Sequence, residues 1–398
     1  MRFRNQIALT MLIQGVGALA MLAATLMIGL SLGPAQQGKF SLVRAELQFI
    51  GALCLFGLPQ AIFYFSESNR LERKKVYLLV GGVAIITLIV AFFYSLLTYG
   101  EEISYAMIFA LAVSISNIYG VLRGAVLAHS STRYFNLVSA APQIIVLFFI
   151  ITIIPYINEF QDWQIAFIFL SSAAISAVFT FIVVNRRVNF PVFGMSVEVN
   201  EIVKYGAGAW LTAVLLGTSS FFWLKYIENS LGITAVGIFT MGLIAINFIL
   251  TPLNLGLPLL FKRWTNNISN KDSLKSTLIS GVAVFIAVAT ILLLTNFMPK
   301  LPFLVAYSSL EQFKWIFGMT AVAEVMLRLS GVAGNAMGLP VIHTLAEATR
   351  ALSLAVFFLW VDQITLLLII KGWMFGAIMA VAASIFCMLF IRSKKSLI

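Results

Sequence analysis

Two stretches of this sequence share one pattern at a constant offset. Residues 32–59 read LGPAQQGKFSLVRAELQFIGALCLFGLP, and residues 231–258 read LGITAVGIFTMGLIAINFILTPLNLGLP. The offset is 199 residues without a gap, and nine of the 28 aligned positions are identical. Both stretches are apolar, so composition explains part of this agreement. Composition does not explain two glycines and a Gly-Leu-Pro that match in register, and we interpret the pair as an internal repeat.

Each copy of the repeat predicts the same hairpin. The Leu-Gly-x4-Gly pattern closes a turn between two helices, where glycine tolerates a positive φ and lets helix ends approach closely. The Gly-Leu-Pro at residues 57–59 and 256–258 can kink its helix, since proline removes a backbone hydrogen bond. The copies are expected six helices apart, which is an even number, so both face the same way. This predicts a parallel repeat, related by an axis along the membrane normal.

The composition places these helices in a membrane. Of the 398 residues, 61% are hydrophobic and 10% are charged, and the mean hydropathy is +1.00. A soluble domain has roughly 45–50% apolar and about 25% charged residues. These values exclude a soluble globular protein, a disordered chain and a secreted disulfide scaffold. Cys54 and Cys387 lie in apolar runs and imply neither a disulfide nor a metal site.

Twelve stretches are long and apolar enough to cross a bilayer, which takes about 20 residues. They cover approximately residues 7–32, 40–64, 76–97, 103–127, 137–155, 164–184, 205–229, 235–260, 276–295, 313–335, 341–361 and 364–391. The first is too long for a signal peptide, and no small-residue cleavage site follows it. We therefore predict an all-α integral membrane protein with twelve transmembrane helices in two parallel pseudo-symmetric six-helix bundles, residues 1–204 and 205–398.

The basic residues orient the predicted spans. When the N-terminus is placed in the cytoplasm, 17 of the 26 Lys and Arg residues fall in cytoplasmic segments and three in outer segments. Such a bias is typical of multi-pass proteins and predicts that both termini are cytoplasmic. The net charge of +11 then reflects topology and contact with anionic membrane lipids, and we do not expect nucleic acid as a partner.

Ten charged residues fall within the predicted spans, where a charge at the helix centre costs roughly 2.5–3.5 kcal/mol. They are Arg44, Glu46, Arg123, Lys225, Glu228, Glu324, Arg328, Glu347, Arg350 and Lys371. So many charges are expected to face a water-filled cavity, one another or the membrane interface. Six are basic and four acidic, and this small positive excess suits an anionic substrate.

Structural explanations compete with a functional one for these charges. Arg123 can snorkel to the inner interface along its long stem. Lys225 and Glu228 are three residues apart on one helix face and favour an interfacial ion pair. Two deeper pairs also have helical spacing, although buried pairs add little net stability. These deeper pairs are Glu324–Arg328 and Glu347–Arg350.

Arg44 and Glu46 are present in only one copy of the repeat, because their mates at the 199-residue offset are Leu243 and Ala245. Packing symmetry therefore does not require a charge at either position. Arg44 is the strongest single candidate for a substrate site, and an anchor in the outer headgroups is its alternative. The two residues lie about 200° apart around a helix, so they cannot both face one cleft.

The sequence lacks the patterns of several other classes of protein. Both histidines lie near predicted cytoplasmic loops, and no His, Cys and carboxylate cluster suggests a metal site. There is no glycine-rich phosphate loop with a lysine, so the chain is not expected to be an ATPase. All connecting loops are short and leave no room for an extramembrane catalytic domain. We therefore expect a transporter that is not an enzyme and carries no cofactor or metal.

Three stretches resemble a known family. They are LGPAQQGKFSL…GLPQAIFYF at the first hairpin, LRGAVLAHSSTRYFNLV after the fourth span and KGWMFGAIMAVAAS in the last span. They look like the polysaccharide or O-antigen repeat-unit flippases of the multidrug/oligosaccharidyl-lipid/polysaccharide exporter superfamily. The resemblance covers nearly the whole chain. It implies a flippase that moves an undecaprenyl-pyrophosphate-linked oligosaccharide repeat unit across the bacterial inner membrane by alternating access.

This resemblance also implies roles for the charges. Basic cavity residues are expected to hold the pyrophosphate, and the candidates are Arg44, Arg123, Arg328 and Arg350. Three acidic residues are expected to orient these arginines or to carry a coupling proton, namely Glu46, Glu324 and Glu347. The implied partners are the lipid-linked oligosaccharide, membrane lipids and other polysaccharide-assembly proteins.

Two alternatives to a flippase remain open. One is an ion-coupled multidrug or small-molecule exporter of the same superfamily. That branch favours an acidic, cation-binding N-terminal half, whereas the first predicted span has no acidic residue. The other is an accessory membrane protein without transport activity.

Overall fold

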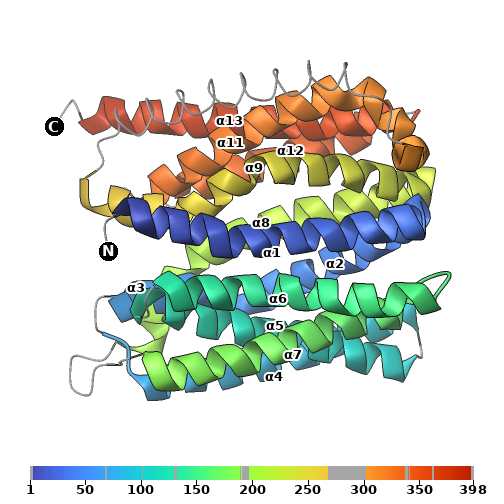
Figure 1. Cartoon of the computed structure of the whole chain (residues 1–398). Coiled ribbons are helices and arrows are strands. Elements are labelled where there is room, and N and C mark those ends of the chain that lie inside the picture. The colour runs from blue at the N-terminus through green and yellow to red at the C-terminus, as the bar shows by residue number, and fades with distance from the viewer. Residues whose placement is uncertain are drawn as a thin grey trace. The chain divides into compact units, whose positions relative to one another are not determined.

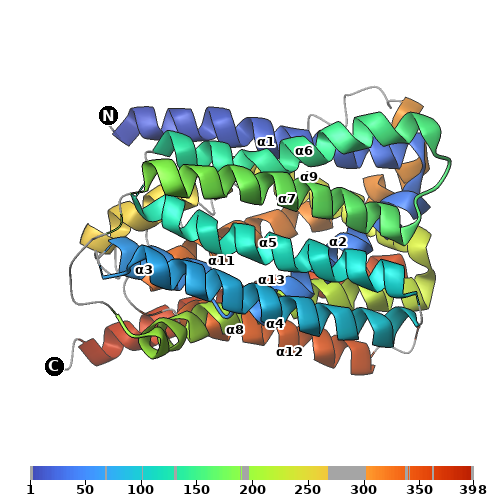
Figure 2. The same cartoon turned by 90° about the horizontal axis from the view of Figure 1, so that it is seen from below.

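The computed structural model describes residues 3–67, 70–100, 102–129, 132–188, 190, 197–267, 302–336, 339, 341–360 and 363–395. In these ranges every regular element is helical (Figures 1 and 2). The predicted all-α class is therefore confirmed. The elements are α1 (Phe3–Ser31), α2 (Pro34–Leu55), α3 (Leu58–Glu67), α4 (Arg73–Tyr99), α5 (Ile103–His129), α6 (Thr132–Ile153), η1 (Ile154–Tyr156), α7 (Asp162–Arg187), α8 (Val199–Leu231), α9 (Ile233–Asn267), η2 (Pro302–Phe313), α11 (Lys314–Ala336), α12 (Val341–Trp360) and α13 (Leu366–Lys395).

The described helices correspond to eleven of the twelve predicted spans, with α2 and α3 together forming one span. Nine of them are long and apolar enough to cross a membrane alone, and the bent pair α2 and α3 makes ten. α9 contributes a shorter apolar segment, Ile233–Asn247. The ninth predicted span, residues 276–295, lies outside the described residues.

The first Gly-Leu-Pro bends its span by 52° between α2 and α3. Phe56 and Gly57 at the bend have φ values of 51° and 65°, and the helix resumes at Leu58. A Cβ atom on Gly57 would overlap the carbonyl oxygen of Gly206 in α8, so close helix approach also requires glycine here. The predicted kink is confirmed in this copy. In the second copy, α9 continues as a helix through residues 256–258, and the kink stays a prediction there.

The chain folds into two compact units. Unit 1 comprises Met1–Ser31 and Lys39–Gly217, and unit 2 comprises Leu32–Gly38 and Thr218–Ile398. The helices α2 and α8 therefore contribute residues to both units. The division into bundles at residues 204 and 205 stays a prediction.

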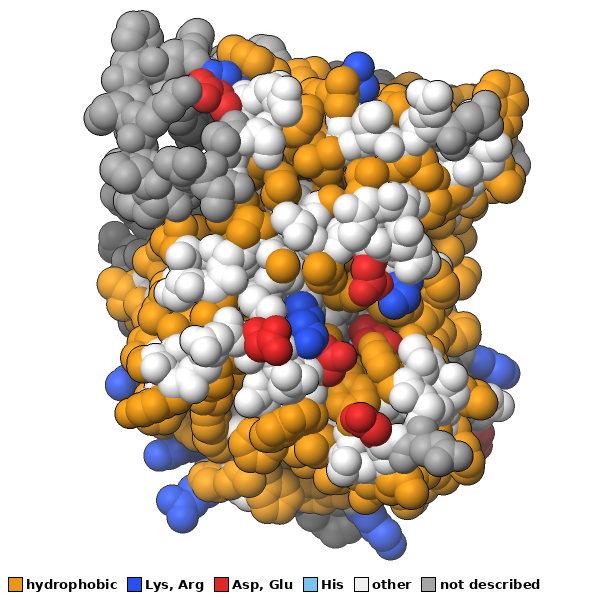
Figure 3. Space-filling view, turned by 90° about the vertical axis from the view of Figure 1, so that its right-hand side faces the viewer, with side chains coloured by type: hydrophobic (Ala, Val, Ile, Leu, Met, Phe, Trp, Pro, Cys, Tyr) orange, Lys and Arg blue, Asp and Glu red, His pale blue; other side chains and the backbone are white. Residues whose placement is uncertain are grey.

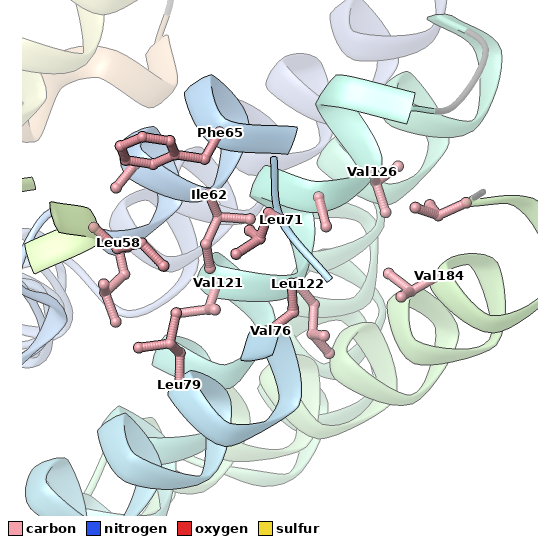
Figure 4. Close-up of a cluster of buried hydrophobic side chains, with 14 of the residues drawn as sticks. Leu58, Ile62, Phe65, Leu71, Val76, Leu79, Val121, Leu122, Val126 and Val184 are labelled. Atoms are coloured by element: carbon pink, nitrogen blue, oxygen red, sulfur yellow. The ribbon is translucent and has the colours of Figure 1, made fainter. Parts of the chain in front are cut away.

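Unit 1 is organised around α5, against which α3, α4 and α7 pack, while α1 packs along α6. The amide of Asn117 in α5 donates to the carbonyl oxygen of Gly51 (3.1 Å) and to the hydroxyl of Thr87 (3.0 Å), which ties α2, α4 and α5 together. A hydrophobic cluster joins α3, α4, α5 and α7 (Figure 4). Its labelled members are Leu58, Ile62, Phe65, Leu71, Val76, Leu79, Val121, Leu122, Val126 and Val184. This packing holds α2 and α3 in place and so positions the charges on α2.

Unit 2 has α11 at its centre, packed against α9, α12 and α13. Aromatic side chains of three other helices meet beside it. The ring of Trp373 in α13 lies 6.0 Å from the ring centroid of Trp223 in α8 and 6.0 Å from that of Phe239 in α9. The charged residues of α11 and α12 are therefore carried into an apolar interior.

Candidate functional site

Four of the predicted site residues meet between α11 and α12 in unit 2, and we call them the unit 2 charge cluster. Nη2 of Arg350 lies 2.8 Å from Oε1 of Glu324, and Nε of Arg350 lies 3.5 Å from Oε2 of Glu347. Nε of Arg328 lies 3.8 Å from Oε2 of Glu324. The two pairs predicted from helical spacing are present. The shortest contact, however, joins α11 to α12, and spacing along one helix cannot predict it.

Burial differs sharply within the unit 2 charge cluster. Arg350 and Glu347 are each 2% exposed, whereas the side chain of Arg328 is 31% exposed. Arg328 also donates from Nη1 to Oδ1 of Asn254 in α9 at 2.5 Å. The guanidinium of Arg350 lies over the ring of Trp373, 5.7 Å from its centroid. Arg350 is thus the fixed centre of the cluster, and Arg328 is its accessible edge.

The charges of the cluster balance, with two arginines against two glutamates. The positive excess expected for the intramembrane residues is therefore not concentrated here. Arg328 is the most exposed member and its ion pair is the longest, so its contact with Glu324 is the one that can be broken at the lowest cost. Arg350 cannot leave its carboxylates without removing the only described ion-pair partner of the buried Glu347 and the closer partner of Glu324.

His343 in α12 was not expected in this region from the sequence. Its ring packs against Gly331 of α11, where a Cβ atom would lie 2.6 Å from Nδ1. Within the described part of the chain, this buried Nδ1 has no hydrogen-bond partner. His343 lies four positions before Glu347 and seven before Arg350, so the three residues share one face of α12. This spacing is the signal in the sequence that could have identified His343.

Another buried carboxylate lies in unit 1. Glu46 of α2 is 1% exposed and accepts hydrogen bonds from the hydroxyls of Tyr94 (2.9 Å) and Tyr99 (2.5 Å) at the end of α4. Tyr105 of α5 packs edge-on against Tyr99, with ring centroids 4.9 Å apart. Its hydroxyl is buried beside that pair. We call these four residues the Glu46 cluster. Sequence reasoning named Glu46 but none of the tyrosines.

Arg44 and Arg123 lie in unit 1, apart from the unit 2 charge cluster. Arg44 is half-buried in α2, and no described residue forms an ion pair or hydrogen bond with its side chain. Arg123 of α5 donates from Nε to the hydroxyl of Ser139 in α6 at 3.0 Å and lies over the ring of Phe135, 5.3 Å from its centroid. The four predicted arginines are therefore distributed over two units.

The remaining intramembrane charges lie near helix ends or on the surface. Lys225 and Glu228 form the predicted ion pair at 2.7 Å. Lys371 of α13 is exposed. A second ion pair, Lys39–Asp162 at 3.3 Å, links α2 to the start of α7. Figure 3 looks onto the end of the molecule where α1 ends, and acidic and basic side chains lie beside one another there among hydrophobic ones. In the described ranges no group of three or more His, Cys, Asp or Glu side chains is placed to hold a metal.

No protein-family model matches the chain, and no curated protein matches it. Several solved structures match it. The outward-facing conformation of a multidrug resistance MATE family transporter of the MOP superfamily matches with a TM-score of 0.73 at 14% identity, over 99% of this chain and 97% of that one. The inward-facing conformation of such a transporter matches with a TM-score of 0.63 at 15% identity, over 100% and 99% of the chains.

A third structure is a MOP superfamily transporter from Pyrococcus furiosus, described as having a binding pocket of reverse polarity that suggests a different function. It matches with a TM-score of 0.71 at 15% identity, over 98% of this chain and 95% of that one. At these identities the likeness establishes the fold. The chain has the MATE-like transporter fold with two pseudo-symmetric bundles, which confirms the predicted fold class.

Proposed function

We propose that this protein is a membrane exporter that works by alternating access. One observation carries the proposal: nearly the whole chain matches multidrug MATE transporters in both outward-facing and inward-facing conformations. A fold that supports two such states can expose one site to each side of a membrane in turn.

The proposed substrate is a small amphipathic molecule. The structural neighbours include multidrug transporters, which favours this substrate over a lipid-linked oligosaccharide. The unit 2 charge cluster supports the same choice. Its two glutamates neutralise its two arginines, so the cluster has no net positive charge to attract an anionic pyrophosphate. Arg328 at its accessible edge offers a polar contact to such a molecule.

Glu46 is proposed to carry the coupling proton. A tyrosine hydroxyl can donate to an ionised carboxylate and can accept from a protonated one, so the Glu46 cluster accommodates both states. Tyr94 and Tyr99 of α4 face Glu46, with Tyr105 of α5 beside them. The multidrug branch favours an acidic N-terminal half, and α1 has no acidic residue. In this proposal α2 supplies that acidic residue. Glu324 and Glu347 orient the arginines of unit 2 in this proposal.

A reconstituted transport assay tests this function. Purified protein in proteoliposomes is expected to move ethidium, a fluorescent amphipathic cation, when a pH gradient is applied. Glu46→Gln should abolish the dependence on the gradient while the variant remains folded. Lys371→Gln removes an exposed charge outside both clusters and is the matched control, with transport expected to be unchanged. Ethidium movement that is equally fast without the gradient would contradict proton coupling.

The second candidate function is a flippase for undecaprenyl-pyrophosphate-linked oligosaccharide. The guanidinium of Arg44, which pairs with no described residue, favours it, since arginine binds phosphate oxygens bidentately. The neighbour with a pocket of reverse polarity adds that this fold accommodates more than one pocket chemistry. The same liposomes, loaded with a fluorescent undecaprenyl-pyrophosphate oligosaccharide, test this directly through quenching by an impermeant reductant. Movement of this lipid without ethidium transport would make the flippase the better assignment.

The orientation is part of the proposal. The distribution of basic residues favours cytoplasmic termini in a bacterial inner membrane, with anionic lipid around the basic ends. A reporter that is active only in the cytoplasm, fused to the C-terminus, should be active. Activity of a periplasm-specific reporter at the same position would reverse the orientation. Contacts with polysaccharide-assembly proteins stay a prediction tied to the flippase.

A further inference from the structure

Several basic side chains at one end of unit 1 have a structural role. Arg73 in the first turn of α4 donates to the carbonyl oxygen of Val188 at 3.2 Å, and Lys75 donates to that of Val197 at 2.7 Å. Arg70 forms an ion pair with the first turn of α8. These three side chains hold the two ends of the connection between α7 and α8 against the start of α4.

Three further arginines at this end have no such role. Arg133 lies in the first turn of α6, and Arg186 and Arg187 lie in the last turn of α7. Figures 1 and 2 show that α6 begins and α7 ends at the same end of unit 1. All three side chains are exposed, and no described residue forms an ion pair with any of them. We call them the α6–α7 arginine group. Their charges are available to an anion from outside the protein.

An aromatic contact joins the two helices at the α6–α7 arginine group. The guanidinium of Arg187 lies over the ring of Tyr134, 5.3 Å from its centroid. Tyr134 directly follows Arg133, so this contact brings the end of α7 to the start of α6. Stacking on the ring uses the face of the guanidinium. Its N–H groups point outward in the guanidinium plane, where they can bind phosphate oxygens bidentately.

Exposed apolar side chains lie one helical turn away from two of these arginines, towards the middle of each span. Leu137 follows Arg133 by four residues, and Ile182 precedes Arg186 by four, so each pair shares one helix face. Leu137 is 37% exposed and Ile182 is 44% exposed. Exposed apolar side chains continue along both helices at Ile144, Phe148, Ile175 and Val178. A soluble phosphate would make no contact with these groups, whereas the acyl chains of a phospholipid would.

We propose that the α6–α7 arginine group binds the phosphate headgroup of an anionic phospholipid, whose acyl chains lie along the exposed apolar side chains of α6 and α7. In the orientation proposed above, this lipid belongs to the cytoplasmic leaflet, where anionic lipids attract basic residues beside membrane helices. That general attraction needs only charge. The stacking of Arg187 on Tyr134 adds a guanidinium plane held in place, which suits a site for one headgroup. The inference concerns a resident lipid and therefore goes beyond the transported molecule.

Native mass spectrometry of the detergent-purified protein tests the site, because it resolves each bound lipid during a titration. Phosphatidylglycerol is the anionic probe, and phosphatidylcholine is the zwitterionic comparison. We expect the native protein to bind its first phosphatidylglycerol about 10-fold more tightly than phosphatidylcholine, since each nearby basic residue favours an anionic lipid. Arg133→Gln with Arg187→Gln should bring the two affinities to within about 3-fold of each other, because a phosphate-binding group is lost from each helix. The affinity for phosphatidylcholine should stay unchanged, which reports that the variant remains folded.

Three comparisons separate a headgroup site from general attraction. Lys74→Gln with Lys204→Gln is the matched control, because it removes two exposed positive charges of unit 1 outside α6 and α7, and the preference should persist. Arg187→Lys keeps the charge but loses the planar guanidinium, and it should lose part of the preference. Glycerol phosphate supplies a headgroup without acyl chains, and at a concentration equal to that of the lipid it should not displace phosphatidylglycerol.

The outcomes are distinct. Loss of the preference in the arginine variants alone, without displacement by glycerol phosphate, supports the lipid site. If the lysine control loses as much preference as Arg133→Gln with Arg187→Gln, the attraction is general and the proposal is wrong. If glycerol phosphate displaces the lipid at equal concentration, the arginines bind a soluble phosphate and the lipid assignment is wrong. No transport is measured, so this inference and the proposed function can fail independently.

Discussion

Glu46 in unit 1 and Glu324 in unit 2 are both buried carboxylates, but they have different partners. Hydroxyls of Tyr94 and Tyr99 donate to Glu46, whereas the guanidinium groups of Arg350 and Arg328 pair with Glu324. A hydroxyl can be donor or acceptor, while a guanidinium is always charged and only donates. Protonating Glu46 therefore leaves no unpaired charge on its hydroxyl partners, and protonating Glu324 leaves buried positive charge. The first site suits proton exchange, and the second suits a fixed framework.

Removing Arg350 should have the largest effect on stability. Arg350→Leu leaves Glu324 and Glu347 buried without their common partner, and loss of one member of a buried pair costs about 3–5 kcal/mol. The unfolding temperature of the purified variant measures this loss. In Arg350→Met with Glu324→Gln and Glu347→Gln, all three charges are removed together, and much of the stability should return. If the single variant is as stable as the native protein, the cluster is not a framework.

The carboxylate of Glu46 should tolerate loss of charge but not loss of its oxygens. Glu46→Ala leaves two tyrosine hydroxyls without their acceptor, which costs about 1–3 kcal/mol per buried group. Glu46→Gln keeps an acceptor oxygen and should unfold close to the native temperature. Equal destabilisation by both variants would show that the negative charge itself, and not the acceptor oxygens, holds unit 1 together.

Arg328 should matter less for stability than Arg350, although both pair with Glu324. Its side chain is 31% exposed, so solvent replaces part of the lost interaction. We expect Arg328→Ala to lower the unfolding temperature by less than half of the shift seen for Arg350→Leu. We also expect it to raise the substrate concentration needed for half-maximal transport. A larger loss of stability than for Arg350→Leu would reverse the assignment of centre and edge.

The smallest effect on stability is expected at Arg44. No described residue pairs with its side chain, so Arg44→Ala should change the free energy of unfolding by about 0.5 kcal/mol or less. A lipid-flipping assay distinguishes phosphate binding by Arg44 from anchoring in the headgroups. If Arg44 binds phosphate, flipping of the pyrophosphate lipid should fall steeply in Arg44→Ala and partly recover in Arg44→Lys. If both variants flip this lipid at the native rate, Arg44 is an anchor in the headgroups.

The sequence by itself determined the helices and the repeat. Runs of about 20 apolar residues can satisfy their backbone only as helices in a bilayer, so the described helices lie at eleven of the positions where hydropathy placed them. The turn glycines Gly33 and Gly232 were also predictable, because a positive φ is a local requirement. Spacing within one helix likewise predicted the pairs Lys225–Glu228 and Glu324–Arg328, since it depends only on helical geometry.

Contacts between helices were decided only by the tertiary structure. Which face of a helix meets which neighbour depends on the packing of all the others, so spacing did not predict that Arg350 binds Glu324 or that tyrosines of α4 bind Glu46. The same reason explains the two Gly-Leu-Pro copies. One breaks the helix between α2 and α3, where Gly57 meets Gly206, whereas α9 remains helical through the other, because a break in a helix depends on what lies beside it as well as on the motif.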